Sequence, residues 1–337
     1  MKNPSCGPML AAAALALSLA PAAAQTNVSV YGQIRLTVNS IKTGNASDLK
    51  ELRDNASRLG FRGIEDLGGG MSALFGLEMG LSADDGTVPA PTYRNSFAGL
   101  RGAYGTVALG RLDSTNPTGS PLYSQVTAIT SFAPNDAGAT AIGTSMLNAR
   151  NRTSNSIGYQ SPNVAGFDVR VRGYLRGAPA TLDSENGAKS LDVGLNYATG
   201  PLKLAFGVAK DKRPGGLLTN EFDNKVQFGV RYDFGSIEPY ALLGRDRYKN
   251  TVATRRDVNY WIVGTKYVVG SHAIVLNAIQ RAVQSNLLGQ RRRQEMSYQY
   301  ALSKRTELQA FIDRDGIDSS KSNVRVRAIG AGIRHDF

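Results

Sequence analysis

Residues 166–176 read GFDVRVRGYLR, and this stretch alternates apolar side chains with charged or polar ones. Phe167, Val169 and Val171 fall on one face of an extended strand, while the acidic and basic residues fall on the other. Two environments produce this pattern: a sheet with one face on a protein core, or a barrel wall between lipid and a water-filled lumen. The rest of the chain has to distinguish between them.

The beginning of the chain indicates export. Lys2 precedes an apolar, alanine-rich run over residues 9–20, and the run closes with PAAA at 21–24. This is the pattern of a secretory signal peptide of residues 1–24, cleaved after Ala24, with a mature domain of residues 25–337. An N-terminal membrane anchor is the weaker alternative, because the run is shorter than the roughly 20 residues of a spanning helix.

Cysteine content and charge narrow the classes of partner. Cys6 is the only cysteine, so the predicted mature chain has no disulfide and no thiolate metal ligand, and we expect no cofactor. Removal of Lys2 lowers the formal net charge from +12 to +11. Such a balance suits nucleic acid, an anionic membrane or anionic solutes, and export makes nucleic acid the weakest of the three.

A two-residue period divides the mature chain into sixteen segments, which we interpret as strands. They are residues 27–38, 57–65, 71–81, 93–102, 106–111, 150–160, 167–176, 191–197, 202–209, 225–232, 237–243, 258–268, 273–282, 295–302, 307–313 and 323–337. The third is the most regular, with six apolar residues in alternation. The segments around Trp261 and Ile274 fit neither phase well.

Connections and aromatic residues favour the barrel over the sandwich. Seven short turns separate eight longer polar loops, which places both termini at the short-turn end. Aromatic residues near the strand ends are expected to flank a lipid band: Tyr31, Phe97, Tyr197, Phe206, Phe228, Tyr232, Tyr298 and Tyr300. The sequence therefore predicts an all-β protein, a 16-stranded antiparallel transmembrane β-barrel with short periplasmic turns and long external loops, in which Arg170 and Arg172 face the lumen.

Several motifs resemble those of the general porins of β-proteobacteria. They are VSVYG at 28–32, SRLGFRGIEDLGGG at 57–70, FAGL at 97–100, YGTVALGR at 104–111, NSIGYQSP at 155–162, LSKRT at 302–306 and GIRHDF at 332–337. The resemblance implies a homotrimer in the Gram-negative outer membrane, in contact with its lipid and lipopolysaccharide. It also implies that Phe337, at the end of an apolar stripe on the closing strand, is recognised by the barrel-assembly machinery.

One departure from the family concerns the first strand. The family usually has an acidic residue shortly after the Tyr31-Gly32 pair, whereas this chain has Gln33-Ile34-Arg35. A lumenal negative charge is thereby replaced by a positive one. The change favours a preference for anions.

The connection over residues 112–149 exceeds the roughly 12 to 15 residues at which structureless loops become uncommon, so we expect it to be functional. Its place after the fifth strand resembles the third loop of porins, which folds into the lumen, and its only acids are Asp113 and Asp136. Opposing this loop we predict a basic wall. The predicted pore-lining residues are Arg35, Arg58, Arg62, Arg94, Arg111, Arg150, Arg152, Arg170 and Arg172, with Glu78, Asp113 and Asp136 as acids.

The predicted function is an outer-membrane channel for small hydrophilic or anionic solutes, because rings of arginine suit an anion-selective pore. The arginines could instead be neutralised by neighbouring carboxylates, which would leave a merely wet wall. The basic run at 291–293 falls in a predicted external loop, and we interpret it as a solvated cluster or a contact for anionic lipid.

Three other functions remain open to different degrees. A solute-specific channel for phosphate or small organic acids would differ by saturable binding, and a plugged structural or adhesive barrel would not conduct. An enzyme is disfavoured, because His272 and His335 are the only histidines and neither lies in a catalytic motif.

Overall fold

The computed structural model describes residues 27–113, 118–132, 152–175, 189–212, 223–249, 255–284, 288–319 and 323–337. The predicted signal peptide lies outside these residues. The described part contains the strands β1 (Asn27–Thr43), β2 (Leu49–Asp54), β3 (Arg58–Gly68), β4 (Met71–Gly80), β5 (Tyr93–Gly102), β6 (Gly105–Asp113), β7 (Arg152–Gln160), β8 (Phe167–Leu175), β9 (Lys189–Thr199), β10 (Leu202–Lys212), β11 (Asn224–Tyr232), β12 (Ile237–Lys249), β13 (Arg255–Val269), β14 (His272–Gln284), β15 (Leu288–Ala301), β16 (Thr306–Ser319) and β17 (Asn323–Asp336), and the helix α1 (Pro121–Ile129).

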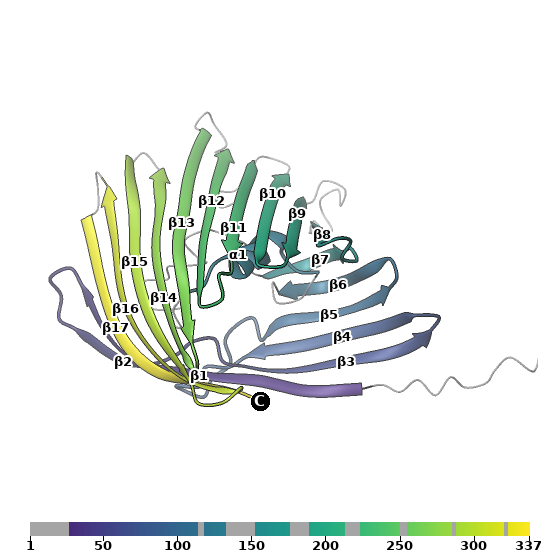
Figure 1. Ribbon diagram of the computed structural model, residues 1–337, viewed down its shortest axis with the longest axis horizontal. Helices are drawn as coiled ribbons and strands as arrows, with labels where there is room; N and C mark the ends of the chain where they lie inside the picture. The colour runs from purple at the N-terminus through teal and green to yellow at the C-terminus, as the bar shows by residue number, and fades with distance from the viewer. Residues whose placement is uncertain are drawn as a thin grey trace, which may run out of the picture.

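The sheet closes on itself into a barrel (Figure 1). Strands that follow one another pair antiparallel, and β1 pairs with β17 from Gln33↔Asp336 to Thr43↔Val326. β2 and β3 both pair with β1, one above the other, so together they occupy a single position in the wall. The predicted 16-stranded antiparallel barrel is therefore confirmed, with one strand interrupted.

The interruption between β2 and β3 is a β-bulge. Gln33 of β1 pairs with Arg58, and Leu36 pairs with Asp54. Three residue steps on β1 therefore correspond to four steps on the partner strand. The extra residue is accommodated at Ala56, whose φ is +68°. The sequence motif that begins at Ser57 marks only the lower half of this strand, and so the prediction missed β2.

Alternation sorts the side chains between two faces, as predicted. On β1, Thr37 and Asn39 are 1% and 2% exposed, whereas the neighbouring Val38 is 63% exposed. On β8, Arg170 and Arg172 share the inward register of Gln160 and Gly158. Large exposed apolar side chains therefore cover the outside and polar groups line the inside. No helix among the described residues is long and apolar enough to cross a membrane.

Two of the predicted girdle aromatics lie inside the barrel. The Tyr31 hydroxyl donates to Glu78, and Phe97 lies opposite Gly76 in the inward register of β4. Both have the inward phase of their strands. Each ring packs against a glycine of the neighbouring strand, Tyr31 against Gly60 and Phe97 against Gly76. The other six aromatic residues keep the outward phase, so the prediction is wrong only for this pair.

The strands around Trp261 and Ile274 are β13 and β14, and their irregular pattern has a structural cause. Their inward residues Ile262, Val275 and Ile279 are each at most 1% exposed, because part of the lumen is filled on this side. Both faces of these strands are consequently apolar, and the two-residue period disappears.

The basic run at 291–293 is not a loop. It belongs to β15, which begins at Leu288, and Arg291 and Arg293 point inward while Arg292 points outward. Several strands continue beyond the apolar band at the long-loop end, where polar residues occupy both faces. The prediction therefore ended these strands too early.

Helix α1 lies inside the barrel, beside β8–β12 (Figure 1). Ser120 caps it by accepting a hydrogen bond from the Tyr123 N–H (3.4 Å), and Pro121 occupies its first turn, where the missing N–H costs nothing. Leu122, Val126 and Ile129 are buried against the wall. The third loop thus folds into the lumen as predicted, and it leaves the opposite side of the lumen open.

Candidate functional site: the open side of the lumen

The position of α1 is fixed by Gln125. Its Nε2 donates to the backbone oxygens of Leu195 (3.3 Å) and Phe206 (2.9 Å) and to Asn196 Oδ1 (3.0 Å). Gln227 Nε2 donates to Gln125 Oε1 (3.0 Å). Gly207 of the wall lies directly beneath this amide. A side chain there would clash with it, because a Cβ at Gly207 would lie only 2.4 Å from Gln125 Oε1. The helix is therefore held to the wall by polar groups as well as by its apolar face.

The chain that follows the helix is held in the same way. The Ser131 carbonyl accepts from Tyr240 Oη (2.9 Å) and Asn277 Nδ2 (2.6 Å), and Arg231 Nη1 donates to Ser131 Oγ (3.2 Å). An apolar cluster fills the space between helix and wall: Val126, Ile129, Ala205, Tyr240, Leu242, Tyr260, Ile262 and Ile279. This half of the lumen is a packed core.

The other half contains a cavity of about 790 Å³. It is bounded by β1, β3–β6 and β17, and its charged lining residues are Arg58, Arg62, Arg101, Arg334, Glu78 and Asp336. Four guanidinium groups thus face two carboxylates. The cavity lies on the side of the barrel away from α1, and it is the part of the described lumen where a solute meets charged side chains.

Glu78 is the centre of a charge cluster on this wall. Its carboxylate is 4% exposed and accepts from Arg94 Nε (2.9 Å) and Tyr31 Oη (3.2 Å), with Arg58 Nε at 3.6 Å. The Arg62 guanidinium stands 5.0 Å from the centre of the Tyr31 ring. One carboxylate is shared by two arginines, so the cluster keeps a net positive charge.

Asp113, at the start of the third loop, is also engaged. It is 1% exposed and accepts from Arg152 Nε (2.6 Å), while its backbone N–H donates to Asn95 Oδ1 (3.3 Å). An acidic residue that is buried in an ion pair contributes little negative potential to the pore. The predicted acidic side of the constriction is weak for this reason.

Arg35 has the inward phase of Thr37 and Asn39 on β1 and lies directly opposite Arg334 of β17. Arg170 and Arg172 face inward too, but their charges are occupied. Arg172 is fully buried and donates to Asp192 and Thr153, and Arg170 donates to Asp168 (2.9 Å) and to Ser124 Oγ of α1 (3.2 Å). Arg170 therefore connects the wall to α1, and Arg172 connects β8 to its neighbours β7 and β9, so both charges are already paired.

Arg111 corrects the predicted set of pore-lining residues. It pairs with Ser96 and shares the outward phase of Val107 and Leu109, and its Nη1 donates to Ser154 Oγ (2.7 Å). Strand parity therefore directs Arg111 away from the lumen. Arg150 and Asp136 lie outside the described residues, so their predicted places in the pore stay predictions.

A second ionic network, which was not predicted from the sequence, lies on β11–β16. Arg293 contacts Glu295 (2.8 Å) and Asp313 (2.7 Å), Arg291 contacts Asp315 (2.9 Å), and Lys225 contacts Asp246 (2.6 Å). The signal was present, because Arg291, Arg293 and Glu295 are two residues apart and keep one phase. The adjacent Arg292 concealed it by making the run resemble a charged loop.

The arrangement can attract and release anions. Arginine stays charged at any physiological pH and pairs with carboxylate, sulfate or phosphate, and several weak contacts permit passage where one tight site would not. Within the described part of the chain, no three His, Cys, Asp or Glu side chains come together as metal ligands. The chemistry of the site is that of an electrostatic filter.

Comparisons with known proteins agree with this architecture. Residues 11–320 match the family described as Gram-negative porin. Outer membrane porin protein 32 of Delftia acidovorans is 30% identical over 96% of this chain and 93% of its own length, and an outer membrane porin protein of Bordetella pertussis is 27% identical over 98% and 99%. The solved anion-selective porin from Comamonas acidovorans superposes with a TM-score of 0.74 (24% identity, 93% of this chain, 100% of the porin), and OmpT of Vibrio cholerae, in trimer form, with 0.68 (13% identity, 93% and 99%).

Proposed function

The chain belongs to the Gram-negative porin family, and from this premise we propose that it selects anions by means of the arginines on the open side of its lumen. As a porin of the outer membrane it forms a channel for the passive diffusion of small hydrophilic solutes and ions. The selectivity is the part that requires an argument from the residues.

The observation that carries the proposal is the imbalance of charge around the cavity. Arg58, Arg62, Arg101 and Arg334 line it against Glu78 and Asp336. Glu78 is engaged by Arg58 and Arg94, and Arg334 contacts Asp336 (2.7 Å) and Glu307 (3.6 Å). Arg62 and Arg101 form no ion pair among the described residues, so they carry the excess positive charge. Low-dielectric walls concentrate the remaining positive field along the pore, which raises the local concentration of anions. The anion-selective character of the structurally similar Comamonas porin supports the same conclusion.

The rival functions make different demands on the lumen. A saturable channel for phosphate or organic acids would need a site that holds one anion, whereas the cavity presents arginines spread over β3, β5 and β17. A plugged barrel would leave no cavity beside the arginine wall. We also propose that the protein is not an enzyme, since its relatives are channels and both histidines are exposed residues on the outer phase of their strands.

Assembly and export complete the proposal. We infer a homotrimer, supported by the trimer form of the structurally similar OmpT, and a signal peptide at 1–24 followed by a barrel domain at 25–337. Phe337 at the end of the closing strand would be read by the barrel-assembly machinery. Outer-membrane lipid, lipopolysaccharide and small anionic or polar solutes are the remaining expected partners.

The selectivity is tested in a planar bilayer with a KCl gradient across it. Replacement of Arg58 and Arg62 by glutamate reverses two lumenal charges, and we expect the ratio of chloride to potassium permeability, obtained from the reversal potential, to fall by about fivefold or more. Wild-type protein that prefers potassium, or a double variant with an unchanged reversal potential, would contradict the proposal.

Arg314→Gln provides the matched control. Arg314 lies on the outward phase of β16, beside Gln294 of β15. The substitution removes a positive charge from the outer surface and leaves the lumen unchanged, so the chloride-to-potassium permeability ratio should stay at the wild-type value. Saturation of the wild-type current by one anion at low concentration would instead favour the solute-specific channel.

A further inference from the structure

The inner wall of β3–β5 carries apolar side chains where the lumen is open. Phe97 of β5 points inward, and Gly99, two residues further along, lies opposite Leu74 of β4. Leu74 in turn lies opposite Ile64 of β3, so all of these residues have the inward phase. We refer to Ile64, Leu74 and Phe97, which line the cavity of about 790 Å³, as the lumenal apolar strip.

The strip is uncovered at Ile64. This side chain is 47% exposed, whereas Ile262 and Phe311, which also have the inward phase, are 0% and 3% exposed. Helix α1 packs against β8–β12 and covers the inner wall there. Ile64 therefore contacts whatever enters the open side of the lumen.

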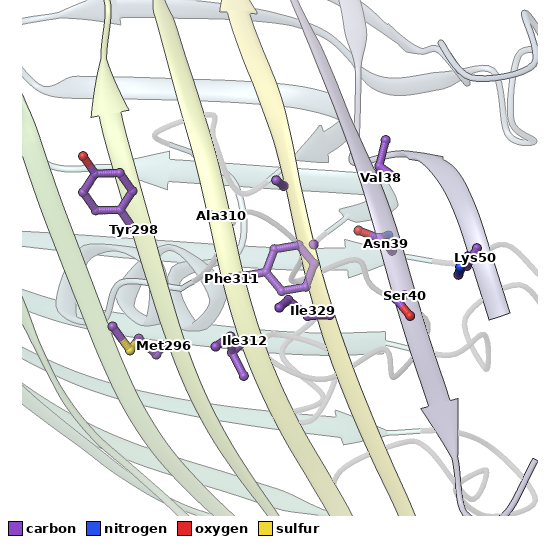
Figure 2. A pocket seen from close by; sticks show the side chains of 12 residues that line it. Val38, Asn39, Ser40, Lys50, Met296, Tyr298, Ala310, Phe311, Ile312 and Ile329 are labelled. Carbon is purple, nitrogen blue, oxygen red and sulfur yellow. The ribbon is translucent and has the colours of Figure 1, made fainter. Parts of the chain in front are cut away.

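The groove in Figure 2 shows where exposed apolar side chains are expected in a barrel. Met296, Ile312 and Ile329 surround it on the outward face, which is in contact with lipid. Ile64 has the opposite phase and borders a water-filled cavity. Contact with lipid therefore does not account for its exposure.

Two guanidinium groups flank the strip. Arg62 lies two residues from Ile64 on the side of the long loops, and Arg101 lies opposite Ser72, two residues from Leu74 on the side of the short turns. Both arginines are exposed, and neither forms an ion pair among the described residues. Unneutralised positive charge and an uncovered apolar surface thus occur together on one wall.

We propose that the strip and its two arginines form a subsite for carboxylates that carry one aromatic ring. The inference rests on the proposed anion channel and names a class of solute within it. The carboxylate accepts N–H donors from Arg62 or Arg101. The ring lies on Ile64 and Leu74, beside the edge of Phe97, whose own ring covers Gly76.

The dimensions of the strip favour a single ring over a longer apolar group. Ile64 and Leu74 lie on adjacent strands, about 5 Å apart, and together they present an area of about one ring. The next pair toward the short turns is Asp66 opposite Ser72, so an extended acyl chain would meet polar groups there. Inorganic phosphate would use the arginines but would gain nothing from the strip.

The contact is weak enough to permit passage. Arg62 and Arg101 are separated by four residues along the strand direction, about 13 Å, so they cannot both hold one carboxylate. The strip is also open to water on one side. Such a subsite raises the local concentration of ring-bearing anions without retaining them.

The test measures the permeability of benzoate relative to chloride, obtained from the reversal potential with KCl on one side of a planar bilayer and potassium benzoate on the other. Shikimate, a ring carboxylate of the same charge whose ring carries hydroxyl groups, is measured in the same way. Ile64→Thr and Ile64→Val have nearly the same volume and differ by a hydroxyl against a methyl group. We expect the benzoate ratio to be about threefold lower in Ile64→Thr than in Ile64→Val, with equal shikimate ratios. Equal benzoate ratios in the two variants, or equal falls for both anions, overturn the proposal.

A second pair of variants separates the subsite from a general effect of lumenal charge. Arg101→Gln removes a cation beside the strip and should lower the benzoate-to-chloride ratio about twofold. Lys203→Gln removes an exposed inward cation of β10, on the side of the barrel that holds α1, and should leave this ratio unchanged. An equal fall in both variants would assign the effect to general charge and would overturn the subsite.

Protection of a thiol locates the bound anion. Ile64→Cys is labelled with a negatively charged methanethiosulfonate, and we expect benzoate to slow the reaction more than the same concentration of shikimate. Equal rates with the two anions would overturn the subsite. The Ile64 variants should keep the wild-type chloride-to-potassium ratio. Loss of the benzoate effect alone therefore contradicts the subsite, whereas wild-type protein that prefers potassium contradicts the anion channel itself.

Discussion

Arg62 and Arg172 have the same charge and the same inward direction, but they do different work. Arg172 is fully buried and neutralised by Asp192, whereas Arg62 is exposed to the cavity and lies over an aromatic ring. Burial of an unpaired guanidinium would be prohibitively expensive, so Arg172 can be fully buried only because the Asp192 carboxylate lies beside it. The alternation along a strand predicts from the sequence that both arginines point inward. It does not predict that Arg172 is buried and Arg62 exposed, because burial depends on residues distant in the sequence.

Removal of the Glu78 charge should strengthen the preference of the pore for anions. Glu78→Gln keeps the shape of the side chain while removing the negative charge shared by Arg58 and Arg94. One unit charge at about 8 Å from a passing ion changes its energy by about 0.5 kcal/mol in water, and screening at about 0.1 M salt reduces this to about 0.2 kcal/mol. The change has opposite signs for chloride and potassium, so the chloride-to-potassium permeability ratio should rise about twofold. The measurement is the reversal potential in a KCl gradient.

Tyr31→Phe is the control for Glu78→Gln. It removes the hydroxyl that donates to Glu78 at 3.2 Å but alters no charge. The permeability ratio should remain unchanged in this variant. A rise of the same size in both variants would mean that rearranged geometry, and not charge, sets the selectivity.

Among the elements, α1 explains most of what the sequence could and could not reveal. The helix makes the inward faces of β12–β14 apolar, through residues such as Leu242 and Ile279, and so removes the alternation that reveals a strand. Where the lumen is open, at β3 and β4, the pattern is clean and the prediction correct. The two-residue period of a barrel strand reflects a lipid environment on one face and water on the other. Where the third loop packs against the inner face, that face becomes apolar and the period is lost.

The anchoring of α1 by Gln125 leads to a second prediction. Gln125→Leu removes an amide whose two N–H groups are shared among three acceptors on β9 and β10, and it removes the acceptor used by Gln227. If each of these three hydrogen bonds contributes about 1 kcal/mol, the helix is loosened by about 2–3 kcal/mol. A helix that leaves the wall obstructs the cavity. We expect several times more frequent closures in single-channel recordings at constant voltage.

Thr127→Ala is the matched control on the same helix. Thr127 Oγ1 donates only to the helix's own carbonyls, those of Ser124 (3.0 Å) and Tyr123 (3.5 Å), and the residue is exposed. Closures should stay at the wild-type frequency. Equal closure rates in Gln125→Leu and wild type would show that the apolar contacts alone hold the helix.

For the whole molecule, closure depends on a seam where the two ends of the chain meet. Gly32 N donates to the Phe337 carbonyl (3.0 Å), and Phe337 N donates to the Gly32 carbonyl (3.1 Å). The Phe337 ring lies over Gly32, where a Cβ would be 2.3 Å from the ring. The alternation within each segment predicts the sixteen strands from the sequence. The bulge at Ala56 and the register of this seam depend on pairing between distant segments, so alternation alone does not predict them.

Truncation of Phe337 distinguishes recognition of the terminal ring by the assembly machinery from packing of that ring at the seam. Its ring is 44% exposed, so its truncation in Phe337→Ala sacrifices about half of the burial of an aromatic side chain, about 1 kcal/mol. Protein refolded in detergent should therefore lose little stability, measured as the shift in its heat-induced mobility change on a gel. In cells the amount of folded barrel should fall much further, because the assembly machinery would no longer read the terminal ring. If the two losses are proportional, the ring acts through packing at the seam alone, and the role of Phe337 as an assembly signal is refuted.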